Sequence, residues 1–258
     1  MIPQIIHYCW FGDKPMPALV RKCIRSWRKH CKGYELREWN EQNFDLSSAP
    51  VYVQQAYEAK KWAFIADYVR LYALVNDGGI YMDTDVEVIR PLDRFLHHQA
   101  FCGFEDDVHI GTGIMACEKG FGLFEAFLKY YDTASFYRED GSMNLATNVK
   151  ILTEICLKHG LQQNNTQQVL QGLTLYPKDV FSPVSHKDGK LHKTKETATI
   201  HWFSSSWMDI KKPGTRKQHI RREKWAGVID WIIHIPHKIG RKLLGKERYE
   251  KLKRRCKD

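Results

Sequence analysis

Two carboxylates that lie one residue apart, Asp83 and Asp85, interrupt the otherwise apolar stretch GGIYMDTDVEVI at residues 78–89. This stretch is expected to form a strand, in which alternate side chains share a face, so both carboxylates would point the same way. Burying two like charges together is unfavourable unless a positive charge lies between them. Paired carboxylates suit a hard divalent cation, Mg²⁺ or Mn²⁺, which takes oxygen ligands and often shares them with substrate phosphates.

Two other interpretations of this acidic pair stay open. Both acids could face solvent at the end of a strand. A phosphatase of the haloacid dehalogenase kind also carries its aspartate nucleophile in a strand-end D-x-D-x-[TV]. Here the fifth position is Glu87, and the acids lie near the middle of the chain rather than after its first strand. The phosphatase is therefore the weaker alternative.

Asp67 and Arg70 form a second pair with possible chemistry. They lie three residues apart in AFIADYVRLYALV, residues 63–75, so they would share one face of an almost wholly apolar helix. The pair could be only a local ion pair. Alternatively, Arg70 could neutralise a phosphate or orient Asp67, whose carboxylate could accept hydrogen bonds from a sugar or ribose hydroxyl.

The elements that would position these groups follow an α/β pattern, which opens as strand, helix and strand. A Gly-Gly turn at Gly78 and Gly79 is expected to link a long buried helix to the strand that carries the acids. Strands are predicted at residues 2–12, 34–40, 80–89, 100–106 and 109–117, and residues 197–207 are predicted to form a late strand that runs into a Ser-rich loop. Helices are predicted at residues 16–31, 51–76, 122–131 and 146–160.

Charge divides the chain into two parts. Residues 211–258 hold 17 Lys/Arg against 5 Asp/Glu, whereas the preceding 210 residues hold 23 against 25. We therefore predict a domain at residues 1–210 and a basic tail at 211–258. In the tail, apolar residues recur at helical spacing among Lys and Arg, as in a helix that lies on an anionic membrane surface. Packing of the tail on the domain and nucleic-acid binding are the alternatives, and no recognised nucleic-acid motif accompanies the basic residues.

The cysteines, the apolar runs and the first residues indicate where in the cell the protein is expected. The seven cysteines are scattered and form no CxxC pair, which argues against a disulfide framework or a zinc site and favours a reducing compartment. No run reaches the roughly 18 apolar residues that span a bilayer, and the first residues lack the features of a signal peptide. We therefore expect a cytoplasmic protein, held peripherally on the inner face of the membrane by its tail.

Three blocks of sequence, in order, resemble the DXD-containing sugar transferases of glycosyltransferase family 32. The blocks are IPQIIHYCWFG, FIADYVRLYALVNDGGIYMDTDVEVIRPLD and IHWFSSSW. The spacing of the central block is highly specific, and the outer blocks are less so. The resemblance implies a Rossmann-like GT-A fold, a nucleotide-sugar donor, a divalent metal, and retention of anomeric configuration.

The resemblance also implies roles for individual residues. Asp83, Asp85 and His201 would bind Mn²⁺ or Mg²⁺, and Asp67, Arg70 and Asp83 would contact the donor. The same four acidic and basic residues form the expected catalytic set: Asp67, Arg70, Asp83 and Asp85. The resemblance further implies that Trp10 would lie against the nucleotide base. A late loop that includes Ser206 and Trp207 would close over the diphosphate.

Simpler explanations accompany several of these roles. Trp10 could be plain core packing, His201 a structural histidine, and the serines after it a turn. The chain departs from the family where T-G-P commonly precedes a helix, because it has Thr147, Asn148 and Val149 there. This departure concerns the contacts expected on the acceptor side.

The expected function is a metal-dependent, retaining transfer of a hexose from a nucleotide sugar, with a UDP-hexose favoured. The acceptor would be a glycan, expected to be lipid-linked, in surface polysaccharide biosynthesis. The sequence offers no clear enzyme nucleophile, so front-face attack is favoured over a covalent intermediate. A non-enzymatic module that binds a membrane or nucleic acid through the tail is the alternative from another class, and nucleic acid is not an expected partner.

Overall fold

The computed structural model of the chain describes residues 1–185 and 188–204. All helices and strands reported below lie in one compact unit formed by residues 1–185 and 191–204. The predicted basic tail, its boundary near residue 210, and the predicted loop residues Ser206 and Trp207 fall outside the described residues. No helix in the described ranges is both long and apolar enough to cross a membrane.

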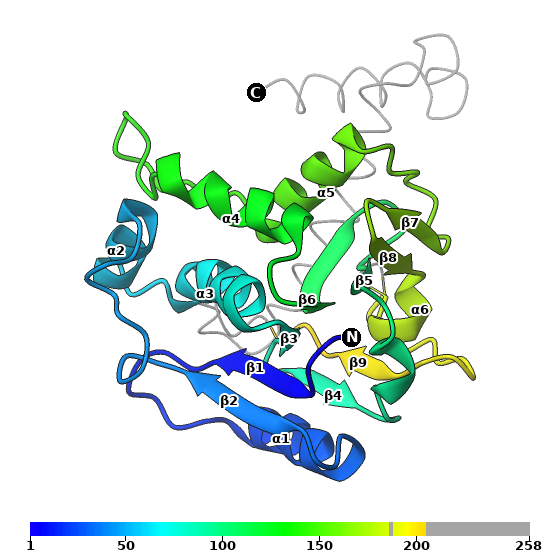
Figure 1. Ribbon diagram of the computed structural model, residues 1–258. Coiled ribbons are helices and arrows are strands. Elements are labelled where there is room, and N and C mark those ends of the chain that lie inside the picture. Colours follow the sequence, from blue (N-terminus) through cyan, green and yellow to red (C-terminus); the bar gives the residue numbers. More distant parts are fainter. Residues whose placement is uncertain (186–187, 205–258) are drawn as a thin grey trace, which may run out of the picture. The chain divides into compact units, whose positions relative to one another are not determined.

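A seven-stranded mixed sheet forms the centre of the fold, with strand order β2-β1-β3-β6-β5-β8-β7 (Figure 1). β1 runs parallel to β2 and β3, and β5 runs parallel to β8, whereas β6 is antiparallel to both β3 and β5. The predicted α/β class is confirmed. The strands are β1 Ile5–Cys9, β2 Glu35–Trp39, β3 Gly79–Met82, β5 Ala100–Phe104, β6 Ile110–Cys117, β7 Gln168–Leu170 and β8 Leu173–Tyr176.

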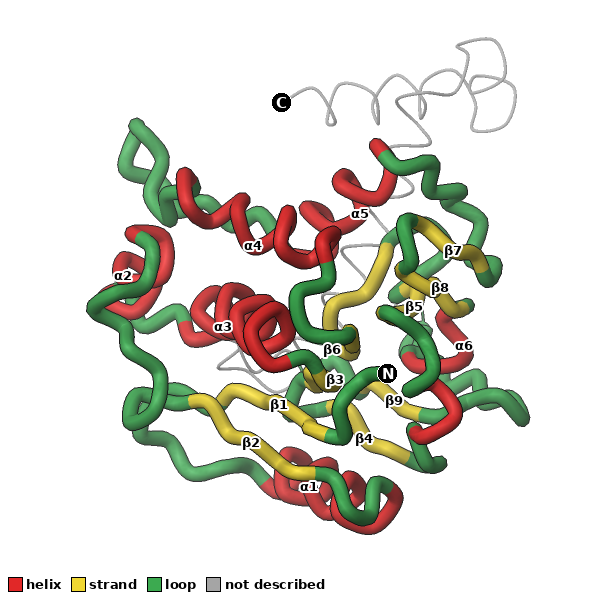
Figure 2. Tube along the Cα trace, viewed as in Figure 1, coloured by secondary structure: helices red, strands yellow, loops and turns green. Residues whose placement is uncertain are grey.

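Helices cover both faces of this sheet, and a two-stranded sheet of β4 and β9 lies on the same side as α1 (Figures 1 and 2). The longest helix, α3, packs with α4 and α5 on the other side. The bounds of these elements are α1 Ala18–His30, α2 Val51–Glu58, α3 Trp62–Asp77, β4 Val86–Val88, η1 Asp93–Phe95, α4 Gly122–Thr133, α5 Asn148–Lys158, α6 Lys178–Phe181 and β9 Thr199–His201.

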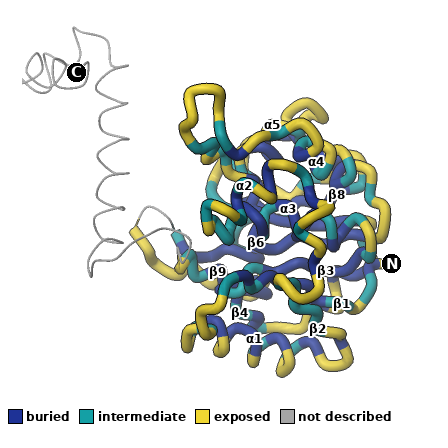
Figure 3. Tube along the Cα trace, turned by 90° about the vertical axis from the view of Figure 1, so that its left-hand side faces the viewer, coloured by how far each residue is buried: buried dark blue, intermediate teal, exposed yellow. Residues whose placement is uncertain are grey.

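The sheet separates two apolar cores, because neighbouring residues of a strand point to opposite faces. On β3, Tyr81 points into the core covered by α2, α3, α4 and α5. Ile80 and Met82 point into the core covered by α1, α6 and β4. Strands β3 and β6 are buried along their whole length, as Figure 3 shows, so the polar groups at their ends stand out against an apolar background.

The prediction of one long helix over residues 51–76 is wrong. The segment forms two helices, α2 and α3, because the chain turns at Lys60, whose φ of 55° lies in the left-handed region. The Lys61 N–H donates to the Ala56 oxygen over 2.9 Å, which closes the turn. The rings of Tyr57 and Trp62 then meet edge to face with centroids 5.5 Å apart, so the corner itself is packed.

The prediction of one strand over residues 80–89 is also wrong, and the error concerns the acidic pair. β3 ends at Met82, the chain turns through Asp83–Asp85, and β4 then pairs with β9 in the second sheet. Asp83 makes the last bond to the large sheet by donating its N–H to the Gly113 oxygen over 2.8 Å. The two carboxylates therefore meet through a turn between two sheets, and the alternation of strand side chains does not explain their proximity.

The end of the described chain also differs from expectation. The late strand predicted within residues 197–207 is present but short, since β9 covers only Thr199–His201 in the described residues. Strands β7 and β8 and the short helix α6 were not predicted, because their apolar runs are only three or four residues long.

Candidate active site

Arg70 is the buried centre of the site, with 5% of its side chain exposed. Its Nη1 donates to the backbone oxygen of Thr112 over 2.6 Å. Its Nη2 lies 2.8 Å from Asp67 Oδ1 and 3.4 Å from Asp83 Oδ1. The guanidinium carbon lies 4.7 Å from the centre of the Tyr81 ring. Burial by itself would lower the pKa of Arg70, but the adjoining carboxylates raise it, so the side chain is a permanent cation.

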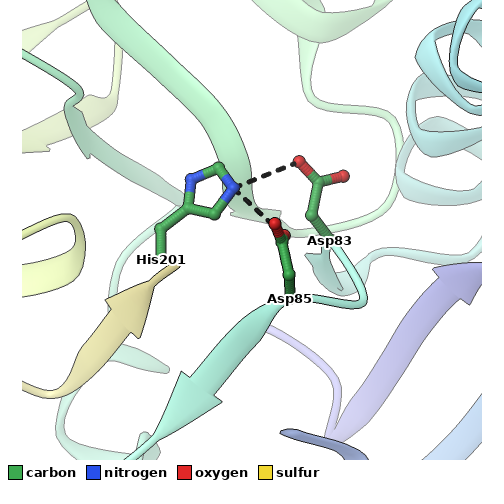
Figure 4. A group of neighbouring side chains, drawn as sticks. All are labelled: Asp83, Asp85 and His201. Atoms are coloured by element: carbon green, nitrogen blue, oxygen red, sulfur yellow. Dashed lines mark ion pairs between the residues drawn. The ribbon is translucent and has the colours of Figure 1, made fainter. Parts of the chain in front are cut away.

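Asp83, Asp85 and His201 converge beside this centre, as Figure 4 shows. His201 Nε2 lies 3.2 Å from Asp85 Oδ1 and 3.9 Å from Asp83 Oδ2. The aspartates come from the turn after β3, and His201 ends β9, which pairs with β4 at Val86. We call Asp67, Arg70, Asp83, Asp85 and His201 the ionic cluster.

Burial and mutual attraction set the charges of these groups. Burial raises the pKa of Asp83, although Arg70 and His201 oppose the rise. Burial would also raise the pKa of Asp85, but His201 and the N–H of Ser204 hold it below its usual value. Burial would lower the pKa of His201, yet Asp85 and Asp83 raise it to about 9. In the metal-free protein at neutral pH, a protonated His201 therefore lies between two carboxylates.

The positive charge that the acidic pair requires is thus supplied partly by the protein itself, through Arg70 and His201. Asp67 is balanced less completely than its neighbours. Burial raises its pKa to about 6, with Arg70 opposing the rise and Asp83 adding to it. Asp67 therefore changes protonation close to neutral pH, whereas Asp85 stays ionised.

The ligand chemistry of Asp83, Asp85 and His201 fits a divalent cation. One donor atom from each residue lies within 4.8 Å of the other two. Metal bonds of about 2.0–2.2 Å place neighbouring ligand atoms roughly 3–4 Å apart, which agrees with the separations of 3.2 and 3.9 Å between the imidazole nitrogen and the carboxylate oxygens. Two carboxylates suit Mg²⁺ or Mn²⁺, and the imidazole makes Mn²⁺ the better fit of the two.

Gly113, in the middle of β6, makes room for this arrangement. A Cβ at this position would lie 2.6 Å from His201 Cε1 and 3.3 Å from Asp83 Oδ2. Its carbonyl also fixes the Asp83 backbone, and the preceding Thr112 carbonyl fixes Arg70. The sequence reasoning missed Gly113. The available signal was a glycine inside a strand, which often marks a close approach of another group.

Asn148, the first residue of α5, is a second residue that the sequence reasoning did not assign. Its side chain is buried, and its Nδ2 donates to the backbone oxygen of Asp67 over 2.9 Å, while its Oδ1 accepts from the Tyr131 hydroxyl. Thr147 caps the helix by accepting the Lys150 N–H. Of the residues that replace T-G-P, Asn148 therefore holds the backbone of Asp67, which places it next to the ionic cluster.

Asp85 also organises the segment that follows β9. Its Oδ2 accepts the Ser204 N–H over 2.7 Å, and its backbone oxygen accepts the Trp202 N–H over 3.1 Å. The Trp202 indole donates to Glu87 Oε2 over 2.9 Å. Two of the three acids of the D-x-D-x-E run, Asp85 and Glu87, thus bind this late segment to the turn.

Trp10 lies apart from the ionic cluster in its described contacts. It follows β1, its indole donates to the Lys14 oxygen over 2.9 Å, and its side chain packs partly buried against the core under α1. Its predicted place against a nucleotide base stays a prediction. The structure thus brings together five of the predicted site residues, leaves Trp10 at the side, and does not describe Ser206 or Trp207.

The central part of the chain matches a known protein family. Residues 17–102 match the family described as "Glycosyltransferase sugar-binding region containing DXD motif". The matched range contains the D-x-D of Asp83 and Asp85 as well as Asp67 and Arg70. The resemblance to DXD glycosyltransferases is therefore confirmed over residues 17–102.

Two curated relatives carry the same class of name. The chain is 30% identical over 127 residues to inositol phosphoceramide mannosyltransferase 3 of Schizosaccharomyces pombe, which covers 46% of this chain and 34% of the relative. It is 33% identical over 101 residues to the uncharacterized glycosyltransferase L373 of Acanthamoeba polyphaga mimivirus, which covers 37% of this chain and 40% of the relative. The chain thus matches well under two thirds of either relative's length.

Solved structures of glycosyltransferases are also similar. PaToxG glycosyltransferase shares 16% identity with a TM-score of 0.47, over 61% of this chain and 69% of that one. The galactosyltransferase LgtC, solved with donor and acceptor sugar analogues, shares 13% identity with a TM-score of 0.41, over 86% of this chain and 99% of that one. Likenesses at this level carry no information about individual residues.

Proposed function

We propose that the chain is a metal-dependent glycosyltransferase of the GT-A kind, which moves a hexose from a nucleotide sugar to a glycan acceptor. The observation that carries this proposal is the ionic cluster. Two aspartates of the family-matched DXD region, Asp83 and Asp85, converge with His201 at metal-ligand spacing, and a buried arginine lies beside them. A UDP-hexose is the favoured donor, and surface polysaccharide biosynthesis is the expected setting.

In this proposal, Asp83, Asp85 and His201 hold Mn²⁺ or Mg²⁺. When bound, the ion neutralises the diphosphate of the donor and the charge that grows on it as the nucleotide departs. Arg70 keeps Asp67 and Asp83 ionised in an apolar surrounding and fixes their orientation through two ion pairs. Asp67 is then available to accept hydrogen bonds from donor hydroxyls, with its backbone held by Asn148.

The bond changes in this proposal need no enzyme nucleophile. The acceptor oxygen attacks the anomeric carbon from the face that the diphosphate leaves, and the acceptor proton passes to a phosphate oxygen. Attack from that face retains the anomeric configuration without a covalent intermediate. A trapped glycosyl–enzyme adduct would contradict this route.

The proposal extends to the acceptor and to the location of the protein. One relative is named for inositol phosphoceramide and mannose, which supports a lipid-containing acceptor and places GDP-mannose in any donor panel. The expected location is cytoplasmic and peripheral on the inner face of the membrane, with residues 211–258 on an anionic surface. Nucleic acid is not proposed as a partner.

Donor hydrolysis tests the proposed activity. The full chain with Mn²⁺ and a panel of UDP- and GDP-sugars should slowly release nucleotide from one donor, and Asp85→Asn should abolish the release. Asp132→Asn, an exposed carboxylate on α4, is the matched control and should keep full activity. The proposal fails if no donor is bound or turned over. Mn²⁺- or Mg²⁺-dependent cleavage of a simple phosphomonoester, lost in Asp85→Asn, would instead support the phosphatase alternative.

A further inference from the structure

The surface of α1 carries a segregated positive charge. Seven of the 23 Lys/Arg in residues 1–210 fall within residues 14–32, which contain no Asp or Glu. Without this stretch, residues 1–210 carry 16 Lys/Arg against 25 Asp/Glu. The helix is therefore a basic strip on an otherwise acidic domain, and ordinary mixed surface charge does not account for it.

The positive charges share one side of the helix. At about 100° per residue, the basic residues within α1 occupy an arc of roughly 120°, and the buried residues occupy a separate arc of roughly 100°. The buried set is Val20, Cys23, Ile24 and Trp27. The exposed basic set within the helix is Arg21, Lys22, Arg25, Arg28 and Lys29, and Lys32 follows it one turn later. Figure 3 shows this alternation of exposed and buried residues along α1.

Two of these cations make specific contacts in the fold. Lys22 pairs with Glu87 and lies over the Trp202 ring, and Arg21 donates to the Met16 oxygen. Within the part of the chain that the structure describes, no carboxylate pairs with the four exposed residues that we call the basic face of α1: Arg25, Arg28, Lys29 and Lys32.

We propose that the basic face of α1 binds the anionic surface of a lipid bilayer. A straight helix of 13 residues is about 20 Å long, so its charges can meet a flat array of acidic headgroups at the same time. Exposed apolar residues lie just before and at the start of the helix, at Pro15, Pro17 and Ala18, where they can enter the interface. Trp27 is buried, so the face offers no aromatic ring on which a base could stack, which disfavours single-stranded nucleic acid.

The position of α1 gives this contact a use. The Trp27 indole donates to the Val86 oxygen over 2.7 Å, so the helix packs on β4, the strand that directly follows Asp85. If α1 binds the bilayer, a lipid-linked acceptor in that bilayer would lie near the domain that contains the ionic cluster. This use rests on the proposed function, whereas the binding itself requires no catalysis.

Vesicle co-sedimentation of the full chain tests the proposal. The first variant combines Arg25→Gln, Arg28→Gln, Lys29→Gln and Lys32→Gln. The matched control removes the same charge from exposed residues around α4 and α5 through Lys119→Gln, Lys129→Gln, Lys150→Gln and Lys158→Gln. Both variants keep residues 211–258, and glutamine preserves helix propensity, which circular dichroism would verify.

We expect binding to phosphatidylcholine vesicles that contain about 30% phosphatidylserine, and little binding to phosphatidylcholine alone. Each cation in contact with the surface strengthens binding about fivefold, so the α1 variant should bind at least tenfold more weakly while the control changes less than twofold. An unchanged α1 variant or an equal loss in both variants would overturn the proposal. Tighter binding to duplex DNA or RNA that the α1 variant loses would assign the face to nucleic acid instead.

The failure of this inference is distinguishable from the failure of the proposed function. Donor hydrolysis in solution should be the same for the wild type, the α1 variant and the control, since none of the substituted residues contacts the ionic cluster. α1-dependent vesicle binding without any donor hydrolysis would leave the inference standing and remove the glycosyltransferase proposal. Donor hydrolysis without α1-dependent vesicle binding would do the reverse.

Discussion

His201 must lose a proton before it can ligate a metal ion, and this requirement makes metal binding depend on pH. In the metal-free protein, Asp85 and Asp83 outweigh the effect of burial and raise the pKa of His201 to about 9. At pH 7 only about one molecule in a hundred therefore has the neutral imidazole that a divalent ion needs. The deprotonation costs about 3 kcal/mol at pH 7, which corresponds to roughly 100-fold in apparent affinity.

The expected result is proton release coupled to binding. Calorimetric titration of Mn²⁺ into the protein at pH 7, in two buffers of different ionisation enthalpy, should report close to one proton released per ion. The apparent association constant should rise about tenfold per pH unit between pH 7 and 8.5. Mg²⁺ should show the same slope at lower affinity, because its preference for oxygen ligands makes poorer use of the imidazole.

A matched variant separates His201 from the other titrating groups. His201→Asn removes the proton while keeping a polar side chain of similar size, so it should bind Mn²⁺ more weakly and with little pH dependence above pH 7. Tight Mn²⁺ binding by the wild type at pH 7 without proton release would refute the assignment of His201 as a ligand. A variant that still releases a full proton would show that another group supplies it.

Further predictions concern the packing of the same site. Gly113→Ala should weaken Mn²⁺ binding at least tenfold, because the new Cβ would lie 2.6 Å from the His201 ring. Gly122→Ala is the control and should leave the affinity unchanged, because no atom lies within 4 Å of its Cβ. Equal affinities of the two variants would contradict the close approach. Arg70→Met should lower the free energy of unfolding by about 3–5 kcal/mol in urea titrations, since it leaves buried carboxylates without their cation. An Arg70→Met loss below about 1 kcal/mol would mean that Asp67 is neutral or hydrated in the fold. Asn148→Ala should lower the free energy of unfolding by about 1–3 kcal/mol in the same assay, because it leaves the Asp67 carbonyl and a tyrosine hydroxyl without partners. An unchanged free energy of unfolding would show that water replaces the amide. In EDTA, protonated His201 should stabilise the fold by up to about 3 kcal/mol, because its pKa of about 9 exceeds the ordinary value of 6.5. This contribution is complete below pH 6.5 and disappears as the pH rises through 9. An unfolding free energy at pH 6 that is the same in His201→Asn and the wild type would refute it.

Local sequence patterns predicted much of the architecture because local forces decide it. The amphipathic spacing over residues 16–31 predicted α1, and the apolar run in 109–117 predicted β6, because both patterns match the face that each element buries. The pattern failed at Lys60, where a single residue with positive φ splits an apparently continuous helix. It also failed for β7 and β8, whose three- and four-residue runs lie below the length at which alternation is informative.

The sequence likewise predicted only part of the candidate site. Residue types and spacing were enough to single out Asp67 with Arg70 and Asp83 with Asp85, because each pair is unusual within an apolar stretch. The sequence did not show why Asp83 and Asp85 lie close together, because the predicted strand that would hold both acids is a turn between two sheets. Resemblance to a family suggested His201, whereas residue type and spacing did not.

The sequence by itself determined most of the longer elements, which residues carry unusual charge, and that the acidic pair requires a positive partner. Only the tertiary structure decided what that partner is. Arg70 comes from α3 and His201 from β9, more than a hundred residues apart along the chain. The pairing of β3 with β6 brings Thr112 to Arg70 and Gly113 to His201. The energy of a buried charge depends on distances to groups that are remote in sequence, so no local pattern could specify it.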